Sequence, residues 1–83
     1  MPKMRAKMVV TGVEESFLEG KKVGERLSFN AVANCPYPED GSDEDNTYAK
    51  FSPDARLSIY VANPALFDQF KTNEKYYVDF SQA

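Results

Sequence analysis

The stretch RLSFNAVA, residues 26–33, carries the clearest strand signal in this chain. Its side chains alternate between two faces, one of them wholly apolar, and a period of two is typical of a half-buried β-strand. The apolar face holds Leu27, Phe29, Ala31 and Ala33, and the other face holds Ser28, Asn30 and Val32. This stretch therefore predicts a protein built around a β-sheet.

The segment before it predicts a second strand that pairs with the first. Residues 5–18 indicate one long strand, or two short ones, bending at Gly12, because glycine inside a strand often marks a bulge. Ala6, Met8 and Val10 share one face of this strand, and Val9 and Val13 are expected on the other. Residues 19–24 contain two glycines and predict a turn. A connection this short joins antiparallel strands, so we expect a hairpin.

The C-terminal half predicts two further strands, over residues 55–62 and 75–81, and an ordered segment over 47–51 that would add a short strand. Asn63 and Pro64 form a helix start signal, which predicts a helix over 65–70. The expected order is β-β-loop-(β)-β-α-β. This order favours a mainly β fold with one short α-helix, either a small OB-like or SH3-like barrel or a half-open antiparallel sheet.

Length and composition limit what the chain can do. Its 83 residues allow one small domain, spanning 1–83, with 42% hydrophobic and 13% aromatic residues for a core. It contains no histidine, which removes Ser-His-Asp chemistry and ordinary zinc sites. The single cysteine, Cys35, lacks a histidine base and is expected to be a small residue at a strand end. We therefore expect no enzymatic activity, no metal site and no cofactor.

Charge and hydropathy bear on partners and compartment. The net charge of −3 disfavours a general nucleic-acid coat, which needs Lys and Arg to neutralise phosphates. The longest early apolar run, residues 8–10, is too short for a signal-peptide core, and no stretch approaches the length of a membrane helix. The expectation is an intracellular protein without a membrane contact.

Residues 39–46 form the most unusual segment, because five of the eight are acidic and none is apolar. Such a loop is either solvated or docked on a partner, since its self-repulsion opposes collapse onto a core. Its oxygen donors also raise the alternative of a Ca²⁺ site, although the spacing is not that of an EF-hand. The candidate protein-binding residues are Glu39, Asp40, Asp43, Glu44, Asp45 and Asn46.

Outward-facing tyrosines form a second candidate site. Tyr48, Tyr60 and Tyr77 are expected on exposed positions of strands, where aromatic rings can stack unpaired bases. With Arg56 and Lys75 beside them, Tyr60 and Tyr77 would form a nucleic-acid face. The alternatives are that Tyr60 and Tyr77 are cross-strand neighbours that shield the sheet, or that they lie in a protein interface.

Three segments together carry a resemblance to known proteins. They are DGSDEDNTYAKFSP at 40–53, LSIYVANPA at 57–65 and YYVDF at 76–80. This pattern resembles a group of small, mostly uncharacterised proteins encoded by tailed bacteriophages and prophages, which share an acidic Asn-Thr segment, "F-S/T-P", "NPA" and a final "YYVDF". The resemblance covers roughly residues 38 to 82. It implies a phage origin and no particular activity or ligand.

These observations lead to an expected function. The chain is expected to be a non-enzymatic bacteriophage accessory protein that binds a phage or host protein, as a virion or assembly component or as a host-directed effector. The alternative is an OB-like single-stranded nucleic-acid-binding protein. Either would be found in the host cytoplasm, and a virion component would also be found in the particle. An exposed edge strand in so small a sheet could also pair with a second copy of the chain.

Overall fold

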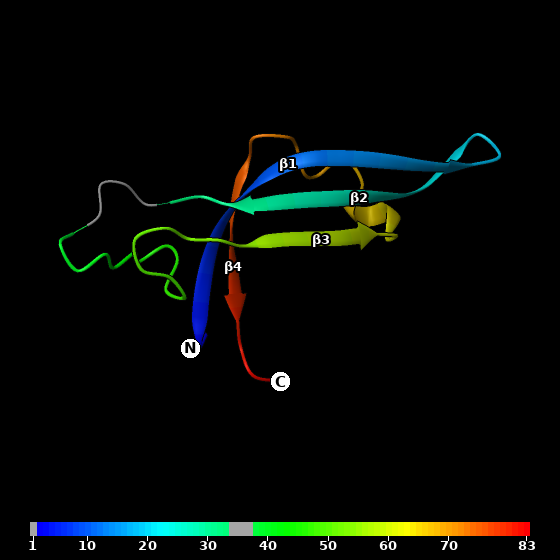
Figure 1. Cartoon of the computed structure of the whole chain (residues 1–83). Helices are drawn as coiled ribbons and strands as arrows, with labels where there is room; N and C mark the ends of the chain where they lie inside the picture. The colour runs from blue at the N-terminus through cyan, green and yellow to red at the C-terminus, as the bar shows by residue number, and fades with distance from the viewer. Residues whose placement is uncertain (1, 34–37) are drawn as a thin grey trace.

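A computed structural model describes residues 2–33 and 38–83, and the strands of these residues form one antiparallel sheet (Figure 1). The strands are β1 (Met4–Leu18), β2 (Lys21–Ala31), β3 (Arg56–Val61) and β4 (Lys75–Phe80). Their spatial order is β3-β2-β1-β4, so β3 and β4 are the two edges. The mainly β class and the open antiparallel sheet are confirmed.

The hairpin between β1 and β2 is tighter than the sequence predicts. Its turn consists of Glu19 and Gly20, both with positive φ, 52° and 79°. Two-residue turns of this kind match the right-handed twist of the flanking strands. The predicted turn over 19–24 is therefore wrong in its second part, because residues 21–24 continue β2.

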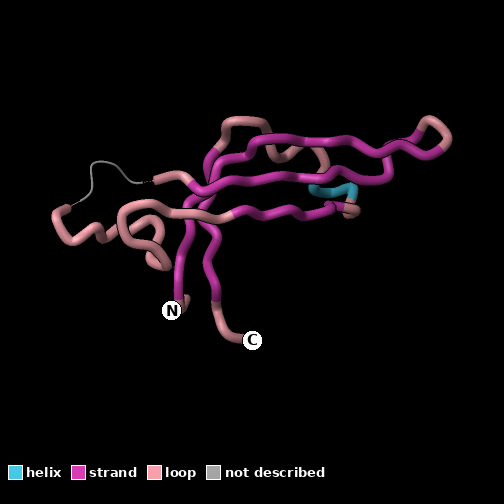
Figure 2. Tube along the Cα trace, in the orientation of Figure 1, coloured by secondary structure: helices cyan, strands magenta, loops and turns pink. Residues whose placement is uncertain are grey.

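A bulge in β1 shapes the whole sheet. The register with β2 shifts between Val10 and Gly12, so the bulge predicted at Gly12 is confirmed. The first part of β1 pairs with β4, and this two-stranded arm crosses β2 and β3 (Figures 1 and 2). After the bulge Val13 pairs with Leu27 and packs against the core. The prediction that Val13 faces away is thus wrong, because the extra residue reverses the alternation.

The core lies on one face of this bent sheet, which we call the inner face. Its buried hydrophobic residues are Ala6, Met8, Val10, Leu27, Phe29 and Val61. Each such side chain contributes about 1.5–3 kcal/mol when fully buried, apart from the smaller alanine. Ile59 belongs to the same face but is 43% exposed, so the inner face is only partly covered.

The predicted helix over 65–70 is wrong. Only a 3₁₀ turn, η1 (Pro64–Leu66), forms, although the predicted cap is present, since the Ala65 N–H donates to the Asn63 side chain at 3.1 Å. The chain then leaves the helical path, because Asp68 has a φ of 64°. Phe67 and Phe70 instead pack against the core. Burial of these two rings outweighs the weak helix signal of a six-residue segment.

No strand forms over residues 47–51, so the short optional strand is also wrong. Tyr48, expected at an exposed strand position, instead packs against the core and is partly buried, whereas Phe51 is 54% exposed. The expected position of Cys35 lies outside the described residues.

The molecule is elongated for its length. Its extents are 54 × 28 × 16 Å and its radius of gyration is 15.3 Å. A compact chain of this length has a radius of gyration of about 12 Å. The accessible surface is 6024 Å², whereas a monomeric protein of this mass typically exposes roughly 5000 Å². Among the described residues, no helix is long and apolar enough to cross a membrane.

Candidate functional site

The acidic loop is held against β1 by its own polar side chains. Asn46 is fully buried; its Oδ1 accepts the Lys7 N–H at 2.8 Å and its Nδ2 donates to the Val32 carbonyl at 2.7 Å. Asp43, 5% exposed, accepts hydrogen bonds from the Asn46 amide and from the Asp45 N–H. Asn46 therefore occupies the place of a neighbouring strand beside β1.

The remaining acidic residues of this loop divide into two groups. Asp45 bonds to Lys7 at 3.2 Å and accepts the Tyr77 hydroxyl at 2.9 Å, so it also serves the fold. Glu39, Asp40 and Glu44 are exposed. The Ser42 N–H donates to Asp40 and lowers the pKa of that carboxyl below its ordinary value. Of the six predicted protein-binding residues, three thus lie at the surface, and the other three hold the loop against β1.

The two tyrosines of the predicted nucleic-acid face lie on opposite edges of the sheet. Tyr60 is on β3 and Tyr77 on β4, so the prediction that they are cross-strand neighbours is wrong. Each ring instead stacks on an arginine of the adjacent strand. Arg26 lies 5.2 Å from the Tyr60 ring centre and Arg5 lies 4.3 Å from that of Tyr77.

The basic residues predicted beside these tyrosines are likewise separated. Arg56 lies on β3 and Lys75 on β4, so the sheet does not bring the four residues together. Asp79 accepts two hydrogen bonds from Arg5, at 2.7 and 3.0 Å, and this lowers the pKa of the Asp79 carboxyl. The acidic side chain of Asp79 therefore lies next to the arginine on which Tyr77 stacks.

An open groove is the largest apolar feature of the inner face. It has a volume of about 470 Å³ and lies over Leu27 and Phe29, between the β3 side and the β4 side of the bent sheet. Its walls include Leu57, Ile59, Leu66, Phe70, Tyr76 and Val78. We call it the β3–β4 groove. Ile59 and Leu66 are 43% and 45% exposed at its margin.

The groove walls are braced by aromatic contacts. Tyr76 meets Phe29 edge to face at 6.5 Å between ring centres and meets Phe70 at 5.1 Å. The Tyr76 hydroxyl donates to Glu74 at 2.7 Å, which raises the pKa of the phenol and lowers that of Glu74. A groove with fixed apolar walls can receive apolar side chains from another molecule without large rearrangement.

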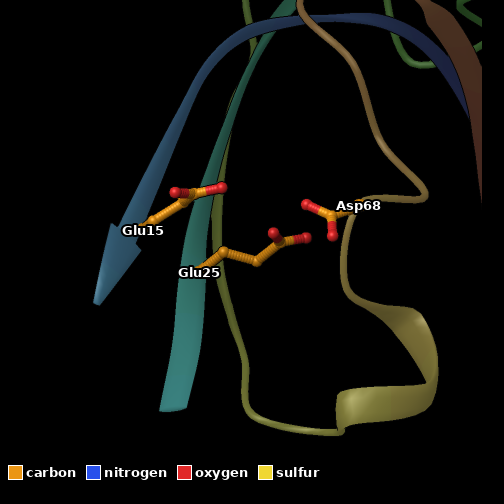
Figure 3. A group of neighbouring side chains, drawn as sticks. All are labelled: Glu15, Glu25 and Asp68. Carbon is orange, nitrogen blue, oxygen red and sulfur yellow. The ribbon is translucent and has the colours of Figure 1, made fainter. Parts of the chain in front are cut away.

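A cluster of three carboxylates lies near the hairpin. Glu15, Glu25 and Asp68 come from β1, β2 and the segment after η1, and their side chains converge (Figure 3). One oxygen of each lies within 4.8 Å of the others. Three converging carboxylates are suited to hold a cation.

The cation in this cluster is the ammonium of Lys22. Its Nζ lies 2.9 Å from Glu25, 3.1 Å from Asp68 and 3.2 Å from Glu15. These carboxylates raise the pKa of Lys22, the hydrogen bond with Glu25 being the largest cause. The Phe67 ring lies 5.0 Å from the same nitrogen. Because Lys22 fills the space between the acids, the cluster is an ion-pair network of the fold.

Neither the groove nor this network was predicted from the sequence. Lys22 and Glu25 are three residues apart in β2, but Asp68 comes from a distant segment, and nothing in the spacing links them. The exposure of the groove residues depends on whether β3 and β4 meet, and alternation within a strand does not report that.

Comparisons with known proteins supply no relative. No family model, no curated protein and no solved structure matches this chain.

Proposed function

We propose that this chain is a non-enzymatic protein-binding module whose contact surface is the β3–β4 groove. The observation that carries the proposal is an inner sheet face left partly uncovered, with Ile59 and Leu66 nearly half exposed beside the core. Contiguous apolar surface of this kind marks interaction sites in proteins of this size. The surface of 6024 Å² exceeds that of a typical monomer of this mass by roughly 1000 Å².

The partner that fits is a protein segment with apolar side chains for the groove and a basic overall charge. The net charge of the chain is −3, and Glu39, Asp40 and Glu44 project from a loop whose base is fixed by Asn46. Surface charges mainly accelerate association and select the partner, whereas buried apolar anchors supply most of the affinity.

The resemblance of residues 38 to 82 to phage proteins suggests where to seek this partner. A bacteriophage origin stays a prediction, as do the two roles of virion or assembly component and host-directed effector. Location in the host cytoplasm, or in the virion, follows from the same resemblance and belongs to the proposal.

Closure into an OB-like or SH3-like barrel is a further part of the proposal. The bulge in β1 lets the arm of β1 and β4 cross β2 and β3 over a shared core, which resembles the start of a barrel. Completing it would require β3 and β4 to pair. A partner segment seated in the groove would bridge these two edges.

Single-stranded nucleic-acid binding is less well supported. The exposed tyrosines Tyr60 and Tyr77 are on opposite edges, and each ring is already stacked on an arginine. A stacking surface needs several rings and basic groups along one path. A labelled oligonucleotide that bound tightly at low salt would favour this alternative over the protein-binding function.

Two matched variants test the groove. Ile59→Asn changes a groove residue that is 43% exposed, and Val23→Asn changes a hairpin residue that is 39% exposed. Partners retained by the wild-type chain from host and phage proteins would be purified, and their affinities for all three proteins measured by calorimetry. We expect Ile59→Asn to weaken binding at least about fivefold, as for an interface anchor, and Val23→Asn to leave it unchanged. Equal affinities for the three proteins would overturn the proposal.

A further inference from the structure

The outer edge of β4 is an unpaired strand edge with a regular hydrogen-bonding pattern. On the opposite side of β1, the N–H groups of Arg5 and Lys7 bond to Thr47 and Asn46. The backbone groups of Ala6 and Met8 therefore face β4, where the register pairs them with Val78 and Tyr76.

The remaining residues of β4 point their backbone groups away from β1. These are Lys75, Tyr77 and Asp79, since hydrogen-bonded and non-hydrogen-bonded pairs alternate along an antiparallel ladder. Among residues 2–33 and 38–83, no strand pairs with this side of β4. An edge with three such residues in line can accept another antiparallel strand.

We infer that β4 pairs with β4 of a second copy, antiparallel and centred on Tyr77, so that two sheets join into one across a two-fold axis. In this register Lys75 lies opposite Asp79 of the other copy, twice by symmetry. All three outward-pointing residues then find backbone partners. Neighbouring registers use fewer of them and lose the two ion pairs.

The charged residues favour self-pairing through β4 over self-pairing through β3, the other edge strand. Lys75 is exposed and has no ion pair or hydrogen bond with any other described residue. Asp79 is bonded to Arg5 but keeps a side-chain exposure of 36%, which leaves room for a second cation. On β3, Arg56 is the sole charged residue, so self-pairing there would form no ion pair. Opposite charges directly across a strand pair stabilise the pairing.

The size of the contact is consistent with the exposed surface. The surface in excess of a typical monomer is roughly 1000 Å², and a standard interface covers about 800 Å² on each partner. Tyr77 and Phe80, 52% and 47% exposed, lie on the strand that would form the contact. Tyr77 and Asp79 also line the groove, but the dimer depends on the backbone groups and charges of the β4 edge, so it does not rest on the proposed apolar partner.

Charge reversal at the edge tests the pairing. Sedimentation equilibrium should show a wild-type dimer that dissociates on dilution. Lys75→Glu would place two acids opposite each other and should raise the dissociation constant by about tenfold or more. Lys71→Glu makes the same change of charge at an exposed residue outside β4 and should leave the constant unchanged. A monomer at all concentrations, or equal effects of the two variants, would overturn the inference.

Disulfide trapping tests the register. In a Cys35→Ser background, Tyr77→Cys places two cysteines opposite each other at a Cα separation of about 5.5 Å, which a disulfide spans. Lys75→Cys places them about 14 Å apart, beyond reach. Oxidation should therefore cross-link Tyr77→Cys and not Lys75→Cys. Cross-linking of Lys75→Cys with itself would overturn the proposed register.

Discussion

The two ends of the molecule each bury one polar side chain completely, but they hold it in different ways. At the loop end, residues 38–50, Asn46 has 0% exposure and bonds to backbone groups of Lys7 and Val32. At the hairpin end, residues 14–25, Glu25 also has 0% exposure and is held by Lys22. Asn46 is thus held mainly by backbone groups, whereas Glu25 is held by an ion network.

The difference lies in how completely each buried group is paired. Both polar atoms of the Asn46 amide are hydrogen-bonded, whereas Glu25 Oε1 is buried and makes no hydrogen bond with any described residue. An unpaired buried oxygen costs free energy that the Lys22 contact must offset. The stability of the loop end, which has one ion pair between Lys7 and Asp45, should therefore depend less on salt than that of the hairpin end.

The largest expected effect is at the loop end. Asn46→Ala leaves the Lys7 N–H and the Val32 carbonyl without their partner, and each such group costs about 1–3 kcal/mol. We expect the free energy of unfolding to fall by about 3 kcal/mol in urea denaturation. Asn30→Ala, at an exposed position of β2, should change it by less than about 0.5 kcal/mol. Equal losses would show that Asn46 does not anchor the loop.

The next largest effect on stability is expected from replacing a glycine at each end, which compares the two ends directly. Gly41 at the loop end has a φ of 74° and Gly20, beside the hairpin end, a φ of 79°, so alanine at either costs about 1–2 kcal/mol. A Cβ on Gly41 would also lie 2.6 Å from the Phe51 ring, whereas a Cβ on Gly20 meets nothing within 4 Å. Gly41→Ala should therefore destabilise more than Gly20→Ala in the same denaturation experiment. The reverse order would contradict the tighter packing of the loop end.

The strands were predictable because each carries its own signal. Alternation in β2 and β3, and the glycine in β1, are local properties of the sequence, and the bulge followed from them. The helix over 65–70 failed because burial of Phe67 and Phe70 is a tertiary effect. The length of the hairpin turn failed because two glycines suggested a longer loop than Glu19 and Gly20 require.

The candidate sites were less predictable because they depend on distant partners. The number of acidic residues indicated a solvated loop, but Asn46 is buried because it bonds to Lys7 of β1, and Asp43 is buried beside it because it accepts hydrogen bonds from Asn46. The carboxylates around Lys22 likewise come together only after Asp68 returns to the hairpin. The types of these residues indicated that they have a structural or functional role. The topology of the fold determines which residues they contact.

A smaller effect is expected when Lys22 is removed at the hairpin end. Lys22→Met leaves three carboxylates facing one another, although two of them are well exposed and screened by water. The urea midpoint should fall in dilute buffer and recover in part at roughly 1 M salt, where the Debye length is about 3 Å. Lys21→Met, the same change at an exposed neighbour, should alter the midpoint little. A deficit independent of salt would contradict an electrostatic role for Lys22.

The smallest expected effect is a difference between the two ends in how their stability depends on pH. The hydrogen bond to Asp45 at the loop end raises the pKa of the Tyr77 phenol, and the hairpin carboxylates raise that of the Lys22 ammonium. A raised pKa stabilises the folded state below the ordinary pKa of the group, and this contribution is lost as pH rises through the folded value. An ordinary tyrosine titrates near pH 10.

The loop end should therefore loosen in alkali as Tyr77 ionises and loses its hydrogen bond with Asp45. The urea midpoint of the wild-type chain should fall more between about pH 9 and pH 11 than that of Tyr77→Phe, which has no phenol to ionise. Tyr48 and Tyr76 also have raised pKa values, but they titrate in both proteins and cancel in the comparison. Identical pH dependence in the two proteins would mean that Asp45 and Tyr77 do not link the loop to β4. In that case the hydrogen bonds of Asn46 and Thr47 with β1 would hold the loop end.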